Sequence, residues 1–214
     1  MYAVIKGDIV SSRKLINQQV WLDPLKAYLN TLGSSPSKWE IMWGDFFQIE
    51  LDDPKDALNV ALKIKALIKG ITPANSGQAK SPLDVRMAIG IGEKTYLGDA
   101  ISENNGPAYI YAGEKFDRLK KEQITIGLKS NWGEFDQEMN LYLSLLEVVF
   151  ERWSTSSAEL FWEVLKNPAF TQSEIGERLG IKQSGVSGRW NRAHIDKLLA
   201  VERQFTEKIN SLLS

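Results

Sequence analysis

A short stretch near the C-terminus gathers side chains that hydrogen-bond to nucleic acids. Between Lys182 and Ile195 the chain carries three basic residues and no acidic one. Arginine and glutamine pair with the edges of guanine and adenine, serine bonds to either, and basic side chains also contact phosphates. The residues with this chemistry are Lys182, Gln183, Ser184, Ser187, Arg189 and Arg192. We therefore expect these six side chains to contact double-stranded DNA.

Composition excludes several other kinds of site. The chain has no cysteine, so disulfides, thiolate metal sites and cysteine nucleophiles are absent. Its single histidine, His194, falls inside a helical pattern, far from any candidate nucleophile. The net charge of −1 does not by itself suggest a nucleic-acid coating protein. A local basic face on a near-neutral chain instead indicates a small DNA-reading surface.

The residues just before this stretch carry the start signal of a helix. Thr171 and Glu174 have capping-box spacing: the threonine oxygen accepts from a first-turn amide, and the glutamate reaches back to the threonine N–H. Gly180 supplies the left-handed residue that ends this helix, and Gly176 leaves room for a crossing helix. A second helix should follow within a few residues.

In that second helix, one side packs inward and the other is polar. Val186, Trp190 and Ala193 recur at helical spacing. The segment 171–193 resembles the helix-turn-helix of many bacterial regulators and sigma-type factors. It departs from the pattern at Lys182, a poor cap, and at two glycines, Gly185 and Gly188, which each cost about 1 kcal/mol of helix propensity. The alternative is a helical hairpin used only for packing or dimerisation.

The first two thirds of the chain alternate between strand and helix patterns. Strands are expected over 2–9, 39–43, 47–51, 85–91 and 124–128, with helices over 20–32, after Asp53, and over 108–121. Gly44-Asp45 between the second and third strands is a hairpin signal. The first six elements match a split βαβ, ferredoxin-like layout. We therefore predict an α+β chain: a ferredoxin-like domain, then an all-α helix-turn-helix domain.

After about residue 133 the pattern is wholly helical, and the whole chain therefore divides into three parts. Residues 1–135 would form the α+β domain, 136–154 a connecting helix, and 155–214 the helix-turn-helix domain. The connecting helix has one apolar stripe, formed by Leu141, Leu145, Val148, Val149 and Trp153. The last helix is amphipathic, and it would either pair two subunits or fold back on its own domain.

Targeting signals are not evident. No apolar run reaches the roughly 18 residues that a membrane span needs. Residues 1–8 lack the basic and apolar regions of a secretory signal. We expect a cytoplasmic protein with no membrane partner.

The two ends of the chain together resemble a known family. Residues 1–13, Met-Tyr-Ala-Val-Ile-Lys-Gly-Asp-Ile-Val-Ser-Ser-Arg, with Gln-Ser-x-Val-Ser near the C-terminus, look like the SatD family of bacterial proteins. More distantly, the front domain is similar to the catalytic domain of class III nucleotidyl cyclases. The similarity lies in Asp8-Ile9 followed by Ser11-Ser12, the Gly44-Asp45 hairpin, and residues 85–92.

The cyclase resemblance implies a site for metal and nucleotide. Mg²⁺ or Mn²⁺ with a nucleotide would use Asp8 and Asp45, because such ions are bound by carboxylates, phosphate oxygens and water. The nucleotide-binding residues implied are Ser11, Ser12, Arg13 and Glu103. Backbone N–H groups at the start of the next helix, together with the Arg13 guanidinium, would hold phosphate oxygens. The alternative is that Asp8 caps a turn and Asp45 is an ordinary hairpin residue.

Cyclisation of a nucleotide is not expected from this domain. Cyclases carry an asparagine and an arginine on the helix after the fourth strand, where this chain has Ile110 and Glu114. Loss of a transition-state arginine typically costs about 10³-fold or more in rate. The lysine that cyclases place before the hairpin turn is also missing, since residues 40–43 are Glu-Ile-Met-Trp.

These observations lead to one hypothesis and two alternatives. The hypothesis is a homodimeric regulator whose degenerate cyclase-like domain senses a nucleotide and whose helix-turn-helix binds double-stranded DNA. The alternatives are a divergent metal-dependent nucleotidyl cyclase or transferase, and a non-catalytic interaction adaptor.

Overall fold

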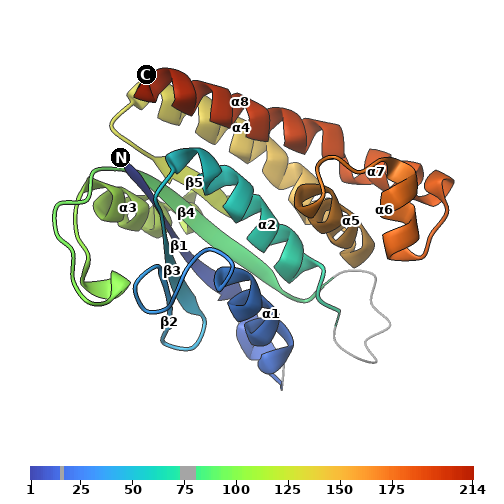
Figure 1. Ribbon diagram of the computed structural model, residues 1–214, viewed down its shortest axis with the longest axis horizontal. Helices are drawn as coiled ribbons and strands as arrows, with labels where there is room; N and C mark the ends of the chain where they lie inside the picture. Colours follow the sequence, from blue (N-terminus) through green and yellow to red (C-terminus); the bar gives the residue numbers. More distant parts are fainter. Residues whose placement is uncertain (15–16, 73–80) are drawn as a thin grey trace.

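The computed structural model describes residues 1–14, 17–72 and 81–214. Within these ranges the chain forms a five-stranded mixed sheet and eight α-helices, which confirms the α+β prediction (Figure 1). The strands are β1 (Tyr2–Val10), β2 (Trp39–Met42), β3 (Phe46–Leu51), β4 (Asp84–Gly92) and β5 (Ile126–Lys129). The helices of this part are α1 (Gln19–Leu29), α2 (Ala57–Lys69) and α3 (Pro107–Glu122). The last strand begins two residues later than its apolar pattern predicted.

The strands lie in the order β2-β3-β1-β4-β5. β1 is central, and it runs antiparallel to both β3 and β4, whereas β5 pairs with β4 in parallel. The predicted hairpin joins β2 to β3, with Trp43 and Gly44 at positive φ (51° and 94°) in its turn. A glycine suits such a position because it has no Cβ to clash with the backbone.

The two faces of the sheet are covered differently. α1 and α2 share one apolar core with the strands, to which Trp21, Leu25 and Ile64 contribute fully buried side chains. α3 packs on the other face across β4, where a Cβ at Gly90 would meet the Ala108 carbonyl oxygen at 2.1 Å. The glycine therefore permits the close approach of α3 to the strand.

The C-terminal part consists of five helices packed against α2 and β5 (Figure 1). They are α4 (Gly133–Arg152), α5 (Thr155–Lys166), α6 (Gln172–Leu179), α7 (Gln183–Ala193) and α8 (Ile195–Leu213). Aromatic contacts join them: Phe135 lies 5.8 Å from Phe205, and Trp153 lies 5.4 Å from Phe161, between ring centroids. These residues belong to the same buried cluster as the strands, so a single core runs from β1 to α8.

The face that α4 buries is not the one its apolar stripe suggested. Phe135, Met139 and Leu143 lie on the buried face, whereas Leu141, Leu145 and Val148 are 51–61% exposed. Of the predicted stripe, Trp153 is the member that is buried, at 2% exposure. The sequence pattern failed here because the helix is apolar on two sides and only one of them contacts the sheet.

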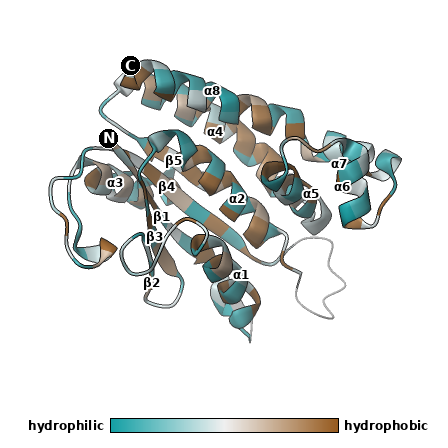
Figure 2. Cartoon of the chain, viewed as in Figure 1, coloured by the Kyte–Doolittle hydropathy of each residue, from teal (hydrophilic) through white to brown (hydrophobic). Residues whose placement is uncertain are grey.

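None of the described helices combines the length and apolar character that a membrane crossing requires. The helices turn their hydrophobic residues toward the sheet and toward each other, while α6 and α7 are coloured mainly as hydrophilic (Figure 2).

Candidate functional site

The helix pair α6–α7 is built around three local features that the sequence predicted. The Thr171 hydroxyl accepts from the Glu174 N–H at 3.3 Å, and the Glu174 carboxylate accepts from the Thr171 N–H at 2.7 Å, which completes the capping box. Gly180 adopts φ +65° and ends α6. A Cβ at Gly176 would lie 2.7 Å from the Ile181 carbonyl oxygen, so glycine allows the turn to pass close to α6. The turn delivers the chain directly into α7.

One side of α7 is anchored and the opposite side is free. Val186 and Ala193 are fully buried. Lys182, Gln183, Ser184 and Arg192 are exposed, and Ser187 is partly exposed. Lys182 makes no side-chain cap, as its residue type suggested. α6 and α7 occupy the end of the molecule farthest from α3 (Figure 1). Four of the six predicted DNA-contacting residues are therefore exposed, and a fifth, Ser187, is partly exposed.

The sixth residue, Arg189, is engaged within the protein. Its guanidinium lies 3.4 Å from the Glu159 carboxylate on α5, and its side chain is 23% exposed. Gln183 also has a local partner, since its amide donates to the Gln172 side chain at 2.8 Å. Asn191 is an exposed polar residue one helical turn after Ser187, and it was not among the predicted DNA-contacting residues. Continuing the polar spacing by four residues would have found it.

A second group of predicted residues meets at the end of β1. Asp8, Asp45 and the segment 11–13 all line one cavity of about 720 Å³. The sheet register explains their proximity: Asp8 pairs with Phe46, and the Ile9 N–H donates to the Asp45 carbonyl at 3.1 Å. β1 extends to Val10, so Asp8 lies inside the strand and not at its end.

Both carboxylates of this cavity already have partners. Both oxygens of Asp8 accept from the Arg86 guanidinium, one of them from Nε at 2.9 Å. The Ser12 hydroxyl donates to Asp45 at 2.6 Å. Across the described residues, no three acidic, histidine or cysteine side chains converge as a metal site would need. A divalent cation would have to displace the arginine from Asp8, so these residues do not fit a resident Mg²⁺ or Mn²⁺ ion.

Three basic side chains line this cavity together with the carboxylates of Asp8, Asp45 and Asp84. Arg13, Arg86 and Lys120 line it, and Arg13 and Lys120 are exposed. Arg86 lies within the cyclase-like segment 85–92, and its residue type and spacing predicted no role for it. Only the β1–β4 register, which pairs residue 8 with residue 86, reveals its contact with Asp8.

A buried polar network lies beneath this cavity. Asp84, one of the lining residues, accepts from Lys65 at 2.5 Å and from Lys69 at 2.9 Å. The Lys65 ammonium also donates to the Thr125 hydroxyl at 2.6 Å, and Thr125 in turn donates to Glu147 of α4. Burial lowers the pKa of Lys65, which the charge of Asp84 opposes. These contacts tie α2, β4 and α4 together.

Glu103 does not line the cavity with Asp8 and Asp45. It lies in the short 3₁₀ turn Ile101–Glu103, where its carboxylate accepts from the Asp99 N–H at 2.9 Å. With Ile110, Glu114 and Lys6 it lines a separate cavity of about 490 Å³. Of the predicted nucleotide-binding residues, the structure thus brings together Ser11, Ser12 and Arg13.

Comparison with known proteins gives one finding. A search of curated proteins returns no match. The model of the SatD family matches residues 2–209, which is nearly the whole chain. The chain therefore belongs to the SatD family.

Proposed function

We propose that this protein is a DNA-binding regulator that uses the outer edge of α7 to enter the major groove. The observation that carries the proposal is the exposure of Ser184, Ser187 and Arg192 on the side of α7 opposite its buried anchors. Recognition helices of helix-turn-helix proteins present this kind of short polar and basic edge to base pairs and phosphates. The capped helix α6 and the glycine turn support the same assignment.

The proposed regulator has a front domain of cyclase-like ancestry. The order β2-β3-β1-β4 supports a ferredoxin-like core, because it is the arrangement that a split βαβ unit produces. The residues at the two expected catalytic positions, Ile110 and Glu114, argue against cyclisation. We therefore assign this domain a sensory role.

The sensory ligand would carry a phosphate group. Arg13 and Lys120 face the cavity at the end of β1, and Arg86 adds a third basic side chain. Guanidinium and ammonium groups bind phosphate oxygens through charge-assisted hydrogen bonds. Calorimetric titration with ATP, GTP and inorganic phosphate tests this ligand class. Arg13→Gln should weaken the binding, and equal binding by the variant contradicts the assignment.

DNA binding is tested with a labelled duplex. Fluorescence anisotropy at low salt measures binding to a random-sequence fragment, since non-specific binding depends mainly on phosphate contacts. Lys182→Gln and Arg192→Gln should each weaken binding. Each should also lower the slope of log K against log salt by about one unit if the side chain contacts a phosphate.

The matched control is Lys121→Gln. Lys121 is an exposed lysine on α3, far from α7, and its substitution by glutamine removes the same charge as Lys182→Gln. It should leave the salt slope unchanged. A Lys182→Gln/Arg192→Gln double variant that binds DNA as tightly as the native protein would refute the proposal.

The proposal includes a homodimer formed through α4. The residues on its outer face follow an alternating four- and three-residue spacing, the heptad pattern of helices that pair. In chain order these residues are Glu134, Glu138, Leu141, Leu145, Val148 and Arg152. Antiparallel pairing with a second copy would cover the exposed apolar residues and place Glu134 of each helix beside Arg152 of the other, whereas Glu138 already pairs with Lys208 of α8. A two-fold dimer also suits a protein that reads two half-sites.

A further inference from the structure

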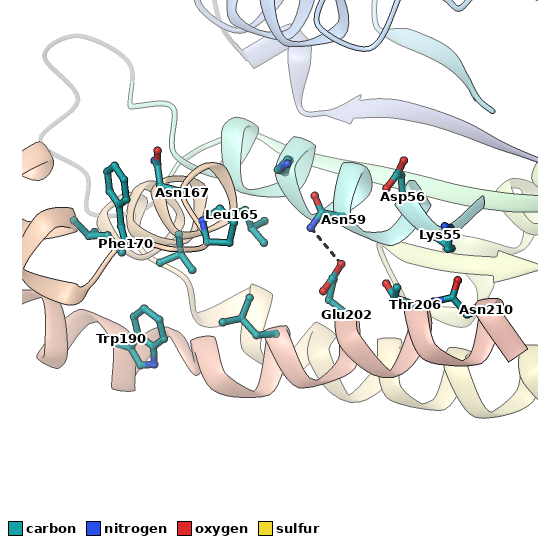
Figure 3. Close-up of a pocket in the computed structure, with 15 residues that line it drawn as sticks. Lys55, Asp56, Asn59, Leu165, Asn167, Phe170, Trp190, Glu202, Thr206 and Asn210 are labelled. Atoms are coloured by element: carbon teal, nitrogen blue, oxygen red, sulfur yellow. Dashed lines mark hydrogen bonds between the residues drawn. The ribbon is translucent and has the colours of Figure 1, made fainter. Parts of the chain in front are cut away.

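A cavity lies between α2 and the C-terminal helices α7 and α8, beside the contact of α2 with α5. It has a volume of about 550 Å³, and its walls come from α2, from the loop between α5 and α6, and from α7 and α8. Figure 3 shows α2 on one side and α8 on the other, with Asn59 and Glu202 pointing toward each other between them. The Asn59 amide donates to the Glu202 carboxylate at 3.3 Å. This volume is within the range of small-molecule sites, about 300–1,000 Å³.

The two ends of the cavity differ in chemistry. Phe170 and Trp190 lie at one end in Figure 3, while Asp56, Thr206 and Asn210 lie at the other. The aromatic end is completed by aliphatic side chains of α5, including Leu165. A ligand that fits this cavity is therefore apolar on one part and polar on another.

Lys63 supplies an unpaired cation to the cavity. Its side chain is half-buried on α2 and lines the cavity, yet it forms no hydrogen bond or ion pair with any residue that the structure describes. Burial lowers the pKa of Lys63, against the opposing charges of Asp56 and Glu202. By contrast, the neighbouring buried lysine of the same helix, Lys65, is held by Asp84. An ammonium group that is partly removed from water without a partner is stabilised when a bound anion supplies one.

The surrounding acids restrict the charge of that anion. Asp56 and Glu202 both line the cavity, so a phosphate with two negative charges would meet repulsion from each. A single carboxylate or sulfonate can pair with Lys63 at a smaller cost. The cavity at the end of β1 differs, because two of its three carboxylates, those of Asp8 and Asp84, are already ion-paired with basic side chains.

We propose that the cavity binds a small monoanionic organic acid with an aromatic or aliphatic body. The acid group accepts hydrogen bonds from Lys63, and the body packs against Phe170 and Trp190. Such a ligand contacts the sheet layer through α2 and the helix-turn-helix through α7 at the same time. The binding itself does not depend on DNA, so it stands or fails separately from the proposed function.

Two fluorescent probes of the same shape test the proposal. The first is 8-anilinonaphthalene-1-sulfonate, an aromatic monoanion, and the second is N-phenyl-1-naphthylamine, its uncharged counterpart. Fluorescence titration of the full chain gives both affinities. Lys63→Met should weaken the sulfonate by about tenfold or more, the effect of losing a charged hydrogen bond, and leave the neutral probe unchanged. Phe170→Ala should weaken both probes.

The control is Lys197→Met, which removes an exposed lysine of α8 that does not line the cavity. It should change neither affinity. Circular dichroism of each variant verifies that it is folded. Lys63→Arg should retain sulfonate binding, which would show that the loss in Lys63→Met comes from the missing charge and not from a disturbed structure at this position. The proposal is overturned if the sulfonate binds the native protein and Lys63→Met equally, if Phe170→Ala affects neither probe, or if the sulfonate does not bind.

Discussion

The Nη1 atom of Arg189 lies 3.4 Å from the Oε2 atom of Glu159, so an arginine of α7 is held by α5. Glu159 is 56% exposed and Arg189 is 23% exposed in their side chains. An exposed ion pair of this kind is weak and can be exchanged for another partner. In the proposed DNA complex, a phosphate would reach Arg189 only by displacing the Glu159 carboxylate.

Glu159→Gln should increase DNA affinity. The change frees Arg189 and removes a negative charge beside α7, and the gain should be about two- to fivefold, the worth of a surface ion pair. Anisotropy titration with the labelled duplex measures it. Glu207→Gln on α8 removes an equivalent exposed charge elsewhere and serves as the control. No increase in Glu159→Gln, or the same increase in both variants, contradicts the role given to Arg189.

The buried network beneath the cavity at the end of β1 predicts unequal effects of substituting Asp84 and Lys65. Asp84→Asn should lower the free energy of unfolding by about 3–5 kcal/mol, because it leaves the Lys65 ammonium, which is fully buried, without its carboxylate. Lys65→Met should cost less, since Asp84 keeps Lys69 and the methionine fills the space of the lysine stem. Urea unfolding of both variants compares them. A larger loss in Lys65→Met than in Asp84→Asn would show that the pair is not organised in this way.

The environment of Glu50 predicts that the stability of the fold depends on pH in the acidic range. Burial raises the pKa of its carboxyl, but hydrogen bonds from Tyr109, Lys94 and Lys38 outweigh burial, so the pKa lies below its ordinary value of 4.5. A carboxyl with a depressed pKa stabilises the fold above its unfolded pKa, and that contribution is lost as the pH falls through the folded pKa. Glu50→Gln should therefore be less stable than the native protein at pH 7, with the difference shrinking below about pH 4.5.

Thermal unfolding between pH 7 and pH 3 measures this convergence. Glu207→Gln provides the comparison, because Glu207 is an exposed carboxylate within α8, away from the first turn of that helix. Its curve should run parallel to that of the native protein. A Glu50→Gln deficit that stays constant over the whole range means that the carboxylate charge is not the source of the stabilisation.

The outer face of α4 predicts the oligomeric state. Leu145→Glu places a charge in the centre of the apolar stripe and should convert a dimer into a monomer, because a buried unpaired carboxylate opposes association. Light scattering coupled to size-exclusion chromatography reports the mass. Leu212→Glu, at a 38% exposed leucine of α8, should leave the mass unchanged. Equal masses for the native protein and Leu145→Glu would place any self-association elsewhere.

The sequence predicted local features well. The capping box at Thr171 and Glu174, the αL residue Gly180 and the turn at Gly44 all appear where their residue types indicated. Each of these depends on contacts within a few residues, which sequence spacing encodes directly. The β1 cavity was partly predictable for the same reason, since Ser11, Ser12 and Arg13 are consecutive.

Contacts between distant segments were not predictable. The Asp8–Arg86 pair requires the register of β1 against β4, and the burial of Lys65 requires the position of α2 over that strand. Neither the strand register nor the position of α2 can be derived from the spacing of residues in the sequence. The exposure of Leu141 and Leu145 was missed because an amphipathic pattern reveals an apolar face but not which neighbour covers it.

The shared core between the sheet and the C-terminal helices limits how a signal can travel. Tyr28 of α1 meets Trp162 of α5 with ring centroids 5.4 Å apart, and the cluster continues through Phe161 to Phe205. A large hinge rotation of the C-terminal helices relative to the sheet would disrupt this packing, whereas sliding of the helices by about 1–2 Å would preserve it. In the proposed regulator, ligand binding should therefore affect α7 by shear of the packed helices. By the same reasoning, cutting the chain after α3 should leave exposed apolar surface on both fragments, so that neither fragment folds independently.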